Sequence, residues 1–346
     1  MIASDHSHNH IRGMTRFSLL DLVPVVEGGT VSQSLSRAAD LARHAETLGF
    51  QRYWVAEHHG MRGIASAATA VVIGHVAAAT KTIRVGAGGI MLPNHAPLII
   101  AEQFGTLDAL FPGRIDLGLG RAPGSDQRVA QAMRRTLDSD PNAFPRDVME
   151  LQSYFADDGR TGIAATPGAG ANVPLWILGS STFGAQLAAA LGLPYAFASH
   201  FAPRLLLQAI DLYRERFRPS ATLDKPYVTI GVPLIAAPTD EEAQYLASST
   251  YQRVLGILTG ARGKLPPPVA NFVEQLQPRE RSAIEDFLAA GVIGGPETVR
   301  RGLETLAERT GADEMMFVCD IFDPALRLRS LDIAAAVKAE EPALVD

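Results

Sequence analysis

Cysteine is almost absent from this chain of 346 residues, in which Cys319 is the single example. One cysteine excludes a disulfide framework and a metal cluster held by several thiolates. It is also typical of proteins that work in a reducing compartment. We therefore expect a cytoplasmic protein.

The chain also lacks a concentration of positive charge and a long apolar run. It carries 31 Lys and Arg against 37 Asp and Glu, for a net charge of −6. No basic cluster is dense enough to follow a phosphate backbone, so nucleic acid is not an expected partner. No apolar stretch is long enough to span a bilayer, so a membrane is not expected either. A hydrophobic content of 47% with 20% charged residues is typical of a globular protein with a sizeable core.

Residues 1–13 differ from the rest of the chain, because they are polar, rich in histidine and without an apolar segment. We expect them to form a tag-like or disordered tail rather than a signal peptide. No shift in composition and no flexible linker divides the chain after that point. Residues 14–346 are therefore expected to form a single domain.

Strand-type and helix-type segments alternate along the chain from residue 15 onward. The strand-type segments are 16–26, 52–59, 83–92, 114–122, 173–179, 195–201, 227–237 and 313–322. Helical spacing of apolar residues marks 32–50, 66–80, 97–113, 126–137, 146–155, 184–192, 204–217, a segment from 239, 296–311 and 324–338. Such alternation implies parallel strands joined by right-handed crossovers. We predict a (β/α)8 barrel with insertions after the fourth strand and its helix and before the eighth strand, where 259–290 breaks the pattern. A doubly wound open sheet is the alternative.

The second strand-type segment ends in Glu57, His58 and His59. Side chains alternate across a strand, so the two histidines should point to opposite faces and cannot easily chelate one metal ion. No further pair of histidines on the first strand completes such a site, and we expect no metal. His58 shares its face with Trp54 and Ala56. A histidine at the barrel mouth is suited to moving protons near neutral pH, or it is a hydrogen-bonded structural residue.

Three other glycine-containing segments lie within strands or directly after them. The glycines of "RVGAGGIML" indicate either the close approach of a ligand or tight packing at a bulge. In "GLGRAPGSD", residues 118–126, Arg121 offers a planar donor for a phosphate. In "GSST", residues 179–182, the start of a helix is a suitable anion site, although Ser180 or Ser181 is equally explained as a helix cap. Together, Arg121 and this helix start favour a phosphate-bearing ligand.

Three motifs in residues 52–124, namely "YWVAEHH", "IRVGAGGIMLPNHAPLIIAEQF" and "GRIDLGLGRAPG", resemble the bacterial luciferase-like family of flavin-dependent monooxygenases. The resemblance extends from about Phe17 through the last helix and implies an eight-stranded barrel. It implies that His58 lies beside the flavin ring and that a cis peptide joins Gly88 to Gly89 beneath the ring. It assigns the FMN phosphate to Arg121 and Ser180. The other residues expected to bind the cofactor are Met91, Gly120, Leu178, Gly179, Ser181 and Thr182.

The implied reaction uses reduced FMN, which a separate NAD(P)H-dependent flavin reductase supplies as diffusible flavin. With dioxygen the flavin forms a hydroperoxide, which transfers one oxygen atom to a small, apolar organic substrate while His58 exchanges a proton. Gly120 stands where the light-emitting subunit has a reactive cysteine, so light emission is not expected. The resemblance also implies a homodimer formed by helices of the first half of the barrel.

The substrate pocket is the least defined part of this interpretation. Leu20, Met61, Met91 and Phe201 are candidates to line it, with ordinary core packing as their alternative. Asp21 is either a second polar group in the pocket or a structural carboxylate. Three other functions are consistent with parts of the pattern: a deazaflavin-dependent dehydrogenase of the same superfamily, a non-catalytic flavin-binding protein and a metal-dependent barrel hydrolase.

Overall fold

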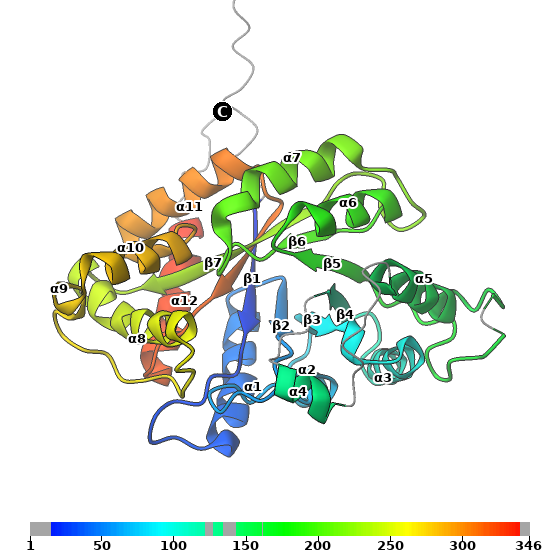
Figure 1. Ribbon diagram of the computed structural model, residues 1–346, viewed down its shortest axis with the longest axis horizontal. Coiled ribbons are helices and arrows are strands. Elements are labelled where there is room, and N and C mark those ends of the chain that lie inside the picture. Colours follow the sequence, from blue (N-terminus) through cyan, green and yellow to red (C-terminus); the bar gives the residue numbers. More distant parts are fainter. Residues whose placement is uncertain (1–14, 122–126, 134–142, 161, 340–346) are drawn as a thin grey trace, which may run out of the picture.

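Eight parallel strands close into a barrel in the computed structural model of the chain (Figure 1). The structure describes residues 15–121, 127–133, 143–160 and 162–339. Around the barrel the strands follow the order β1-β2-β3-β4-β5-β6-β7-β9, and β9 pairs with β1 to close it. These strands are β1 (Arg16–Asp21), β2 (Arg52–Val55), β3 (Arg84–Met91), β4 (Ile115–Gly120), β5 (Leu175–Gly179), β6 (Tyr195–Phe197), β7 (Val228–Ala236) and β9 (Glu314–Val318). The predicted barrel is confirmed.

Helices surround the barrel and connect its strands (Figure 1). They include α1 (Val31–Thr47), α2 (Thr69–Ala79), α3 (Pro97–Leu110), α4 (Gln127–Ala132), α6 (Thr182–Leu191), α7 (Leu206–Arg216), α8 (Asp240–Thr259), α11 (Pro296–Thr310) and α12 (Pro324–Ala339). Short 3-10 turns, η1 (Leu92–Asn94) and η2 (Pro203–Leu205), follow β3 and precede α7. Within the described ranges, none of the helices has both the length and the apolar sequence needed to cross a membrane.

Both predicted insertions are present. After β4 and α4, helix α5 (Ala143–Ala156) precedes β5. Before β9, the chain forms α9 (Phe272–Gln275), α10 (Pro278–Phe287) and β8 (Val292–Gly294), which pairs with the end of β7 outside the barrel. β8 was not predicted, because its three residues are too few to show a strand period. The predicted helix 126–137 is found only as α4, and residues 122–126 and 134–142 lie outside the described part of the chain, as does the tail predicted for 1–13.

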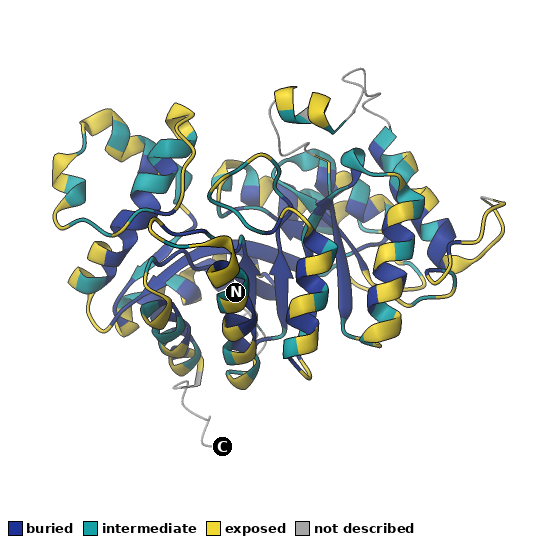
Figure 2. Cartoon of the chain, turned by 90° about the horizontal axis from the view of Figure 1, so that it is seen from below, coloured by how far each residue is buried: buried dark blue, intermediate teal, exposed yellow. Residues whose placement is uncertain are grey.

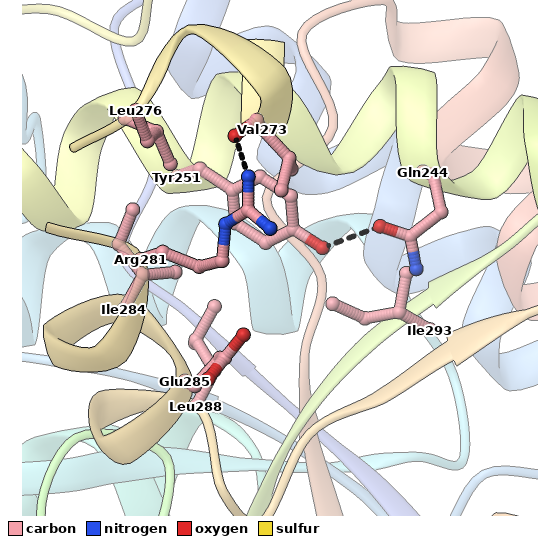
Figure 3. A pocket seen from close by; sticks show the side chains of 9 residues that line it. All are labelled: Gln244, Tyr251, Val273, Leu276, Arg281, Ile284, Glu285, Leu288 and Ile293. Carbon is pink, nitrogen blue, oxygen red and sulfur yellow. Dashed lines mark hydrogen bonds between the residues drawn. The ribbon is translucent and has the colours of Figure 1, made fainter. Parts of the chain in front are cut away.

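The second insertion, with α9, α10 and β8, faces α8 on one side and the loop after β1 on another. A cavity of about 330 Å³ lies between α8, α10 and β8, with the Tyr251 hydroxyl donating a hydrogen bond to Gln244 Oε1 at 2.8 Å (Figure 3). On another side, the Leu265 amide donates to the Val25 carbonyl at 2.9 Å, and the Glu27 amide donates to the Leu265 carbonyl at 2.8 Å. The insertion is therefore tied to the loop that follows β1.

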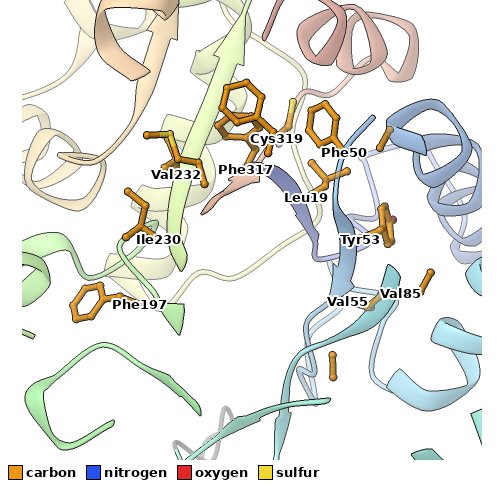
Figure 4. Close-up of a cluster of buried hydrophobic side chains, with 14 of the residues drawn as sticks. Leu19, Phe50, Tyr53, Val55, Val85, Phe197, Ile230, Val232, Phe317 and Cys319 are labelled. Carbon is orange, nitrogen blue, oxygen red and sulfur yellow. The ribbon is translucent and has the colours of Figure 1, made fainter. Parts of the chain in front are cut away.

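The strands are buried on both faces, while the helices expose their outer faces (Figure 2). Such burial explains why the strands read as nearly continuous apolar runs. Outward-facing strand residues such as Leu19, Tyr53 and Phe317 pack against the helices (Figure 4). A separate cluster fills the barrel interior and contains Leu20, Trp54, Ala56, Trp176, Ala196, Met316 and Val318.

The end of the barrel at which the strands begin, its N-terminal end, holds a buried ionic network. Arg52 donates from Nε to Glu314 at 2.7 Å and from Nη1 to Asp116 at 2.6 Å. Trp54 Nε1 donates to the same Asp116 oxygen at 3.1 Å, and the Tyr227 hydroxyl donates to Glu314 at 2.9 Å. Burial lowers the pKa of Arg52, but the negative charges of Glu314 and Asp116 outweigh this effect and raise the pKa above its ordinary range. This end of the barrel is therefore closed by structural ion pairs.

Candidate active site

The predicted site residues lie at the C-terminal ends of the strands, which we call the barrel mouth. His58 lies in the loop after β2, three residues beyond Val55, so this strand is shorter than predicted. Its Nδ1 is buried and has no hydrogen-bond partner among the described residues. Burial, together with the positive charge of Arg253, lowers the pKa of His58 to about 4. His58 is therefore neutral at pH 7 and has one ring nitrogen free to act on a ligand.

His59 contacts Glu57, whereas the Nδ1 of His58 has no hydrogen-bond partner in the described part of the chain. Nε2 of His59 lies 2.6 Å from Glu57 Oε1, and Nε2 of His95 lies 2.9 Å from the same oxygen. The Met91 amide donates to Glu57 Oε2 at 2.9 Å. Burial raises the pKa of Glu57, but the hydrogen bonds from His95 and Met91 bring it below its ordinary value. Glu57 thus ties the loop after β2 to the segment after β3.

Glu57, His59 and His95 are also the group of described residues whose ligand atoms lie close enough together to hold a metal ion. The 2.6 Å between His59 Nε2 and Glu57 Oε1 is a hydrogen-bond distance. Ligand atoms around a tetrahedral zinc ion are about 3.3 Å apart, given metal–ligand bonds of about 2.0 Å. The geometry therefore favours a hydrogen-bonded cluster. His95 was missed in the sequence because its partner is 38 residues away.

Gly88 and Gly89 form a partly exposed surface at the mouth, and the peptide bond between them is cis. A Cβ at Gly89 would lie 2.6 Å from the Gly118 carbonyl oxygen, so the glycine allows β3 and β4 to approach closely. Leu178 packs beside it, 3.1 Å from the same Cβ position. The two glycines therefore present backbone atoms, and no side chain projects from them.

Arg121 lies beside the start of α6, as the sequence predicted. Its guanidinium carbon is 4.2 Å from the centre of the Phe183 ring, in the first turn of α6. Ser181 is the N-cap of this helix, but its side chain accepts no capping hydrogen bond. Ser180, Ser181 and Thr182 are partly exposed, and a Cβ on Gly120 would meet nothing closer than 3.8 Å. Uncapped amides, hydroxyls and a guanidinium therefore lie together, which suits an anion.

Asp21 is the last residue of β1, but its side chain does not face the barrel interior. It is fully buried on the outer face of the barrel, where it accepts hydrogen bonds from the Tyr53 hydroxyl and from Arg327 of α12, the latter at 2.8 Å. The Val23 amide donates to the same carboxylate at 2.9 Å. Both oxygens are therefore engaged, and of the two interpretations of Asp21 the structure favours the structural carboxylate.

The other candidates for the substrate pocket are spread over the mouth. Leu20 is 4% exposed and belongs to the interior cluster, so it forms a floor beneath Gly88 rather than an open wall. Met61, in the segment after β2, and Met91, the last residue of β3, are partly exposed. Phe201 is 48% exposed and lies after β6. Their role as substrate contacts stays a prediction.

Three polar residues near His58 were not selected from the sequence. His200 follows β6, Arg253 lies on α8, and Asp320 follows β9. Arg253 forms an ion pair with the buried Asp320, and both Arg253 and His58 lower the pKa of His200 in addition to burial. His200 has the same strand parity as the interior residue Ala196, so the alternation used for His58 could have identified it.

Similar proteins are found both by sequence and by structure. The family model described as luciferase-like monooxygenase matches residues 15–314. A protein from Escherichia coli K12 named luciferase-like monooxygenase is 51% identical over 325 residues, covering 94% of this chain and 97% of its own.

Among solved structures, apo-MsnO8 has a TM-score of 0.89 with 36% identity, covering 95% of this chain and all of its own. Two others share the fold at low identity. They are the oxygenating constituent of 3,6-diketocamphane monooxygenase from Pseudomonas putida in complex with FMN (TM-score 0.72, 15% identity, 96% of this chain and 100% of that one) and an F420-dependent secondary alcohol dehydrogenase (TM-score 0.63, 17% identity, 93% and 99%).

Proposed function

The chain belongs to the luciferase-like monooxygenase family and is an oxidoreductase, and we propose that it uses reduced FMN and dioxygen to oxygenate a small organic substrate. The observation that carries this proposal is Arg121, stacked on Phe183 at the uncapped start of α6. When bound, reduced FMN supplies two electrons that let dioxygen give one oxygen atom to the substrate and the other to water. The remaining steps belong to the protein.

The first of these is binding of the phosphate. We assign it to Arg121, to the hydroxyls of Ser180, Ser181 and Thr182, and to the first amides of α6. A helix start carries a partial positive charge, and an arginine adds a full charge with a planar set of donors. Since Phe183 supports the guanidinium, less of its mobility has to be lost when the anion binds.

The second is orientation of the ring. We assign its seat to Gly88, Gly89 and Leu178, with Met91, Gly120 and Gly179 as neighbouring contacts. The two glycines present backbone rather than side chains, so a flat ring system can lie against them without displacing atoms. Beneath them Leu20 and Trp54 are buried and keep water away from that side.

The third is handling of a proton at His58. Its Nδ1 is buried and meets no hydrogen-bond partner in the described part of the chain, and the low pKa keeps the ring neutral at pH 7. A neutral imidazole can accept a proton at a free ring nitrogen and return it later in the cycle. His58 is therefore our candidate for the catalytic residue. These observations fit a phosphate-bearing flavin, and at Gly120 a Cβ would meet nothing closer than 3.8 Å.

The remaining features complete the proposal. Residues 14–346 act as one barrel domain. Reduced flavin reaches it by diffusion from an NAD(P)H-dependent reductase in the cytoplasm, where a single cysteine would stay reduced. The substrate is small and largely apolar. Two copies pair through helices of the first half of the barrel, where Val71 on α2 is 73% exposed and Ile99 on α3 is 46% exposed.

Oxygen uptake tests this proposal directly. Purified protein is mixed with photoreduced FMN and a panel of apolar aldehydes, ketones and aromatics, and both oxygen uptake and released peroxide are measured. We expect at least one compound to lower peroxide release while oxygen uptake continues, because oxygen then enters the substrate. Release of all the oxygen as peroxide with every compound, together with no FMN binding in a fluorescence titration, contradicts the proposal.

A deazaflavin-dependent dehydrogenase is the second candidate, favoured by a fold shared with F420-dependent proteins. Such an enzyme transfers hydride and needs no oxygen. Parallel titrations of the protein with FMN and with coenzyme F420 separate the two: we expect the tighter binding with FMN, and the reverse order favours the dehydrogenase.

A further inference from the structure

The chain segment that follows α8 is fixed against two loops of the barrel mouth. A Cβ on Gly63, in the loop after β2, would lie 2.1 Å from the Gly263 carbonyl oxygen, so the two backbones are in direct contact. The Leu265 amide donates a hydrogen bond at 2.9 Å to the carbonyl of Val25, in the loop after β1. The backbone next to Arg262 therefore has a defined position at the rim of the mouth.

Arg262 brings a positive charge to this rim. It is exposed, and within the described ranges no acidic side chain is paired with it. Lys264 differs, because its ammonium donates a hydrogen bond to the Gly29 carbonyl at 2.9 Å. Burial and the charge of Arg253 lower the pKa of His58, and the charge of Arg262 adds to this effect. The field of the Arg262 guanidinium therefore reaches the candidate catalytic histidine.

The charges at the mouth are unbalanced in favour of cations. The cationic side chains of its described segments include Arg62, Arg121, Arg253, Arg262 and Lys264. Among the acids, Asp320 is paired with Arg253, Glu57 is held by hydrogen bonds from two histidines, and Glu27 is exposed. Even with Arg121 assigned to the FMN phosphate, positive charge remains for a second anion. This is a local feature, because the chain as a whole has a net charge of −6.

The barrel interior below the rim is apolar. A Cβ on Gly88 would lie 2.7 Å from Leu20 and 2.9 Å from Trp54, so these side chains lie directly under the proposed ring seat. A ligand that reaches from this seat to Arg262 meets apolar surface at one end and positive charge at the other. The planar guanidinium can donate two parallel hydrogen bonds to a carboxylate or a sulfonate.

We propose that Arg262 binds an anionic group of the substrate, such as a carboxylate or a sulfonate, while the apolar part of the substrate lies toward His58 and the ring seat. This inference deepens the proposed function and rests on it, because it adds one anionic group to a small, largely apolar substrate. An ammonium group is disfavoured at the same place, since it would enter a region of positive charge. Arg262 thus determines specificity and takes no part in oxygen transfer.

Isothermal titration calorimetry with three probes tests this inference. Hexanoate, 1-hexanol and hexylamine share one alkyl chain and carry a negative charge, no charge and a positive charge at pH 7. The protein is saturated with oxidised FMN, so that hexanoate cannot occupy the phosphate site at Arg121. We expect the wild type to bind hexanoate most tightly and hexylamine most weakly. R262Q should lower hexanoate affinity about five- to tenfold and leave 1-hexanol affinity unchanged, whereas R262K should keep part of the preference.

Two control variants separate a contact by Arg262 from a general effect of charge. K264Q removes an equal charge from a side chain that is already bound to a backbone carbonyl, and it should keep most of the preference for hexanoate. R279Q, at an exposed arginine on α10, should bind all three probes as the wild type does. Added salt should weaken hexanoate binding in the wild type more than in R262Q. Each variant is first checked for an unchanged thermal unfolding profile.

The possible outcomes are distinct. Equal affinity for hexanoate and 1-hexanol in the wild type, an R262Q protein that keeps the preference, or equal losses in K264Q and R262Q overturns the inference. A preference that R121L abolishes and R262Q leaves intact also overturns it, because hexanoate then occupies the phosphate site.

Failure of the proposed function gives a different result. FMN then neither binds nor supports oxygen uptake, and the three probes are titrated into the FMN-free protein. A preference for hexanoate that still depends on Arg262 means that the anion site stands without the proposed function. Conversely, FMN binding and substrate-dependent oxygen uptake in a protein whose R262Q variant keeps the preference mean that the inference alone is wrong.

Discussion

The guanidinium carbon of Arg121 lies 4.2 Å from the centre of the Phe183 ring, so a residue that follows β4 is stacked on the first turn of α6. This contact joins two segments that are both candidates for binding phosphate. It also places a full positive charge where the uncapped helix start already favours an anion.

Replacing Arg121 should therefore weaken FMN binding. We expect R121L to raise the FMN dissociation constant about 10- to 100-fold, the loss of a charge-assisted pair of hydrogen bonds. F183L should raise it less, by about two- to fivefold, since it removes only the support under the guanidinium. Fluorescence titration measures both. R279L, at an exposed arginine on α10, is the control, and an R121L protein with wild-type affinity would exclude Arg121 from the phosphate site.

The barrel, and the position of Arg121 beside the start of α6, could be predicted because they depend on local patterns. Alternating strand and helix periods define a barrel, and a barrel brings the ends of its strands to one rim. Arg121 and the start of α6 each follow a strand, so their meeting follows from the fold. The ends of the strands were less predictable. β2 stops at Val55 although "AEHH" continues its pattern, and in the loop beyond it the Glu57 side chain accepts bonds from His59, His95 and the Met91 amide.

Contacts between distant loops were not predictable. His95 and Arg253 meet Glu57 and His58 only through closure of the barrel, and no regular spacing in the sequence marks them. The same limitation applies to Asp21, whose partners Tyr53 and Arg327 are 32 and 306 residues away. A single sequence shows the side chain but not the partner that decides between a pocket and a structural role.

The two mouth histidines should make folding stability sensitive to acid. Their pKa values in the folded protein, about 4 for His58 and about 3 for His200, lie below the ordinary value of 6.5. The unfolded chain therefore binds more protons below pH 6.5, and stability falls as the pH drops from there toward the folded-state values. At pH 5 we expect each histidine to lower the free energy of unfolding by about 1–2 kcal/mol relative to pH 7.5.

Urea unfolding of wild type and H200Q at pH 7.5 and pH 5 measures this effect. H200Q should lose less stability than wild type on going to pH 5, whereas H75Q, at an exposed site, should match the wild type. The same loss in H200Q and wild type would mean that the His200 ring is protonated in the folded protein.

Glu57 should contribute to stability through its hydrogen bonds rather than through a metal ion. It is 1% exposed and accepts from His59, His95 and the Met91 amide. E57Q should lower the free energy of unfolding by about 1–3 kcal/mol, because an amide cannot accept all these bonds with the same strength. E308Q, on the exposed face of α11, should have little effect. Chelator treatment should not shift the melting temperature, and a stoichiometric zinc ion that raises it would contradict this interpretation.

The ionic network at the N-terminal end of the barrel should contribute strongly to the free energy of unfolding without changing FMN binding at the mouth. Arg52 is 5% exposed and pairs with both Asp116 and Glu314. R52L leaves two buried carboxylates without their guanidinium, although Arg84 still contacts Asp116 at 2.6 Å. We therefore expect the free energy of unfolding to fall by about 3–5 kcal/mol, the usual effect of removing one partner of a buried ion pair.

The matched control is R300L, which breaks exposed pairs with Glu297 and Glu304 on α11 and should change stability little, because water screens those charges. FMN affinity measured below the unfolding transition should be the same in R52L and wild type, since the network lies at the opposite end of the barrel from Arg121. A loss of FMN affinity in folded R52L as large as in R121L would mean that the two ends are coupled, and the division into a structural end and a functional end would then be wrong.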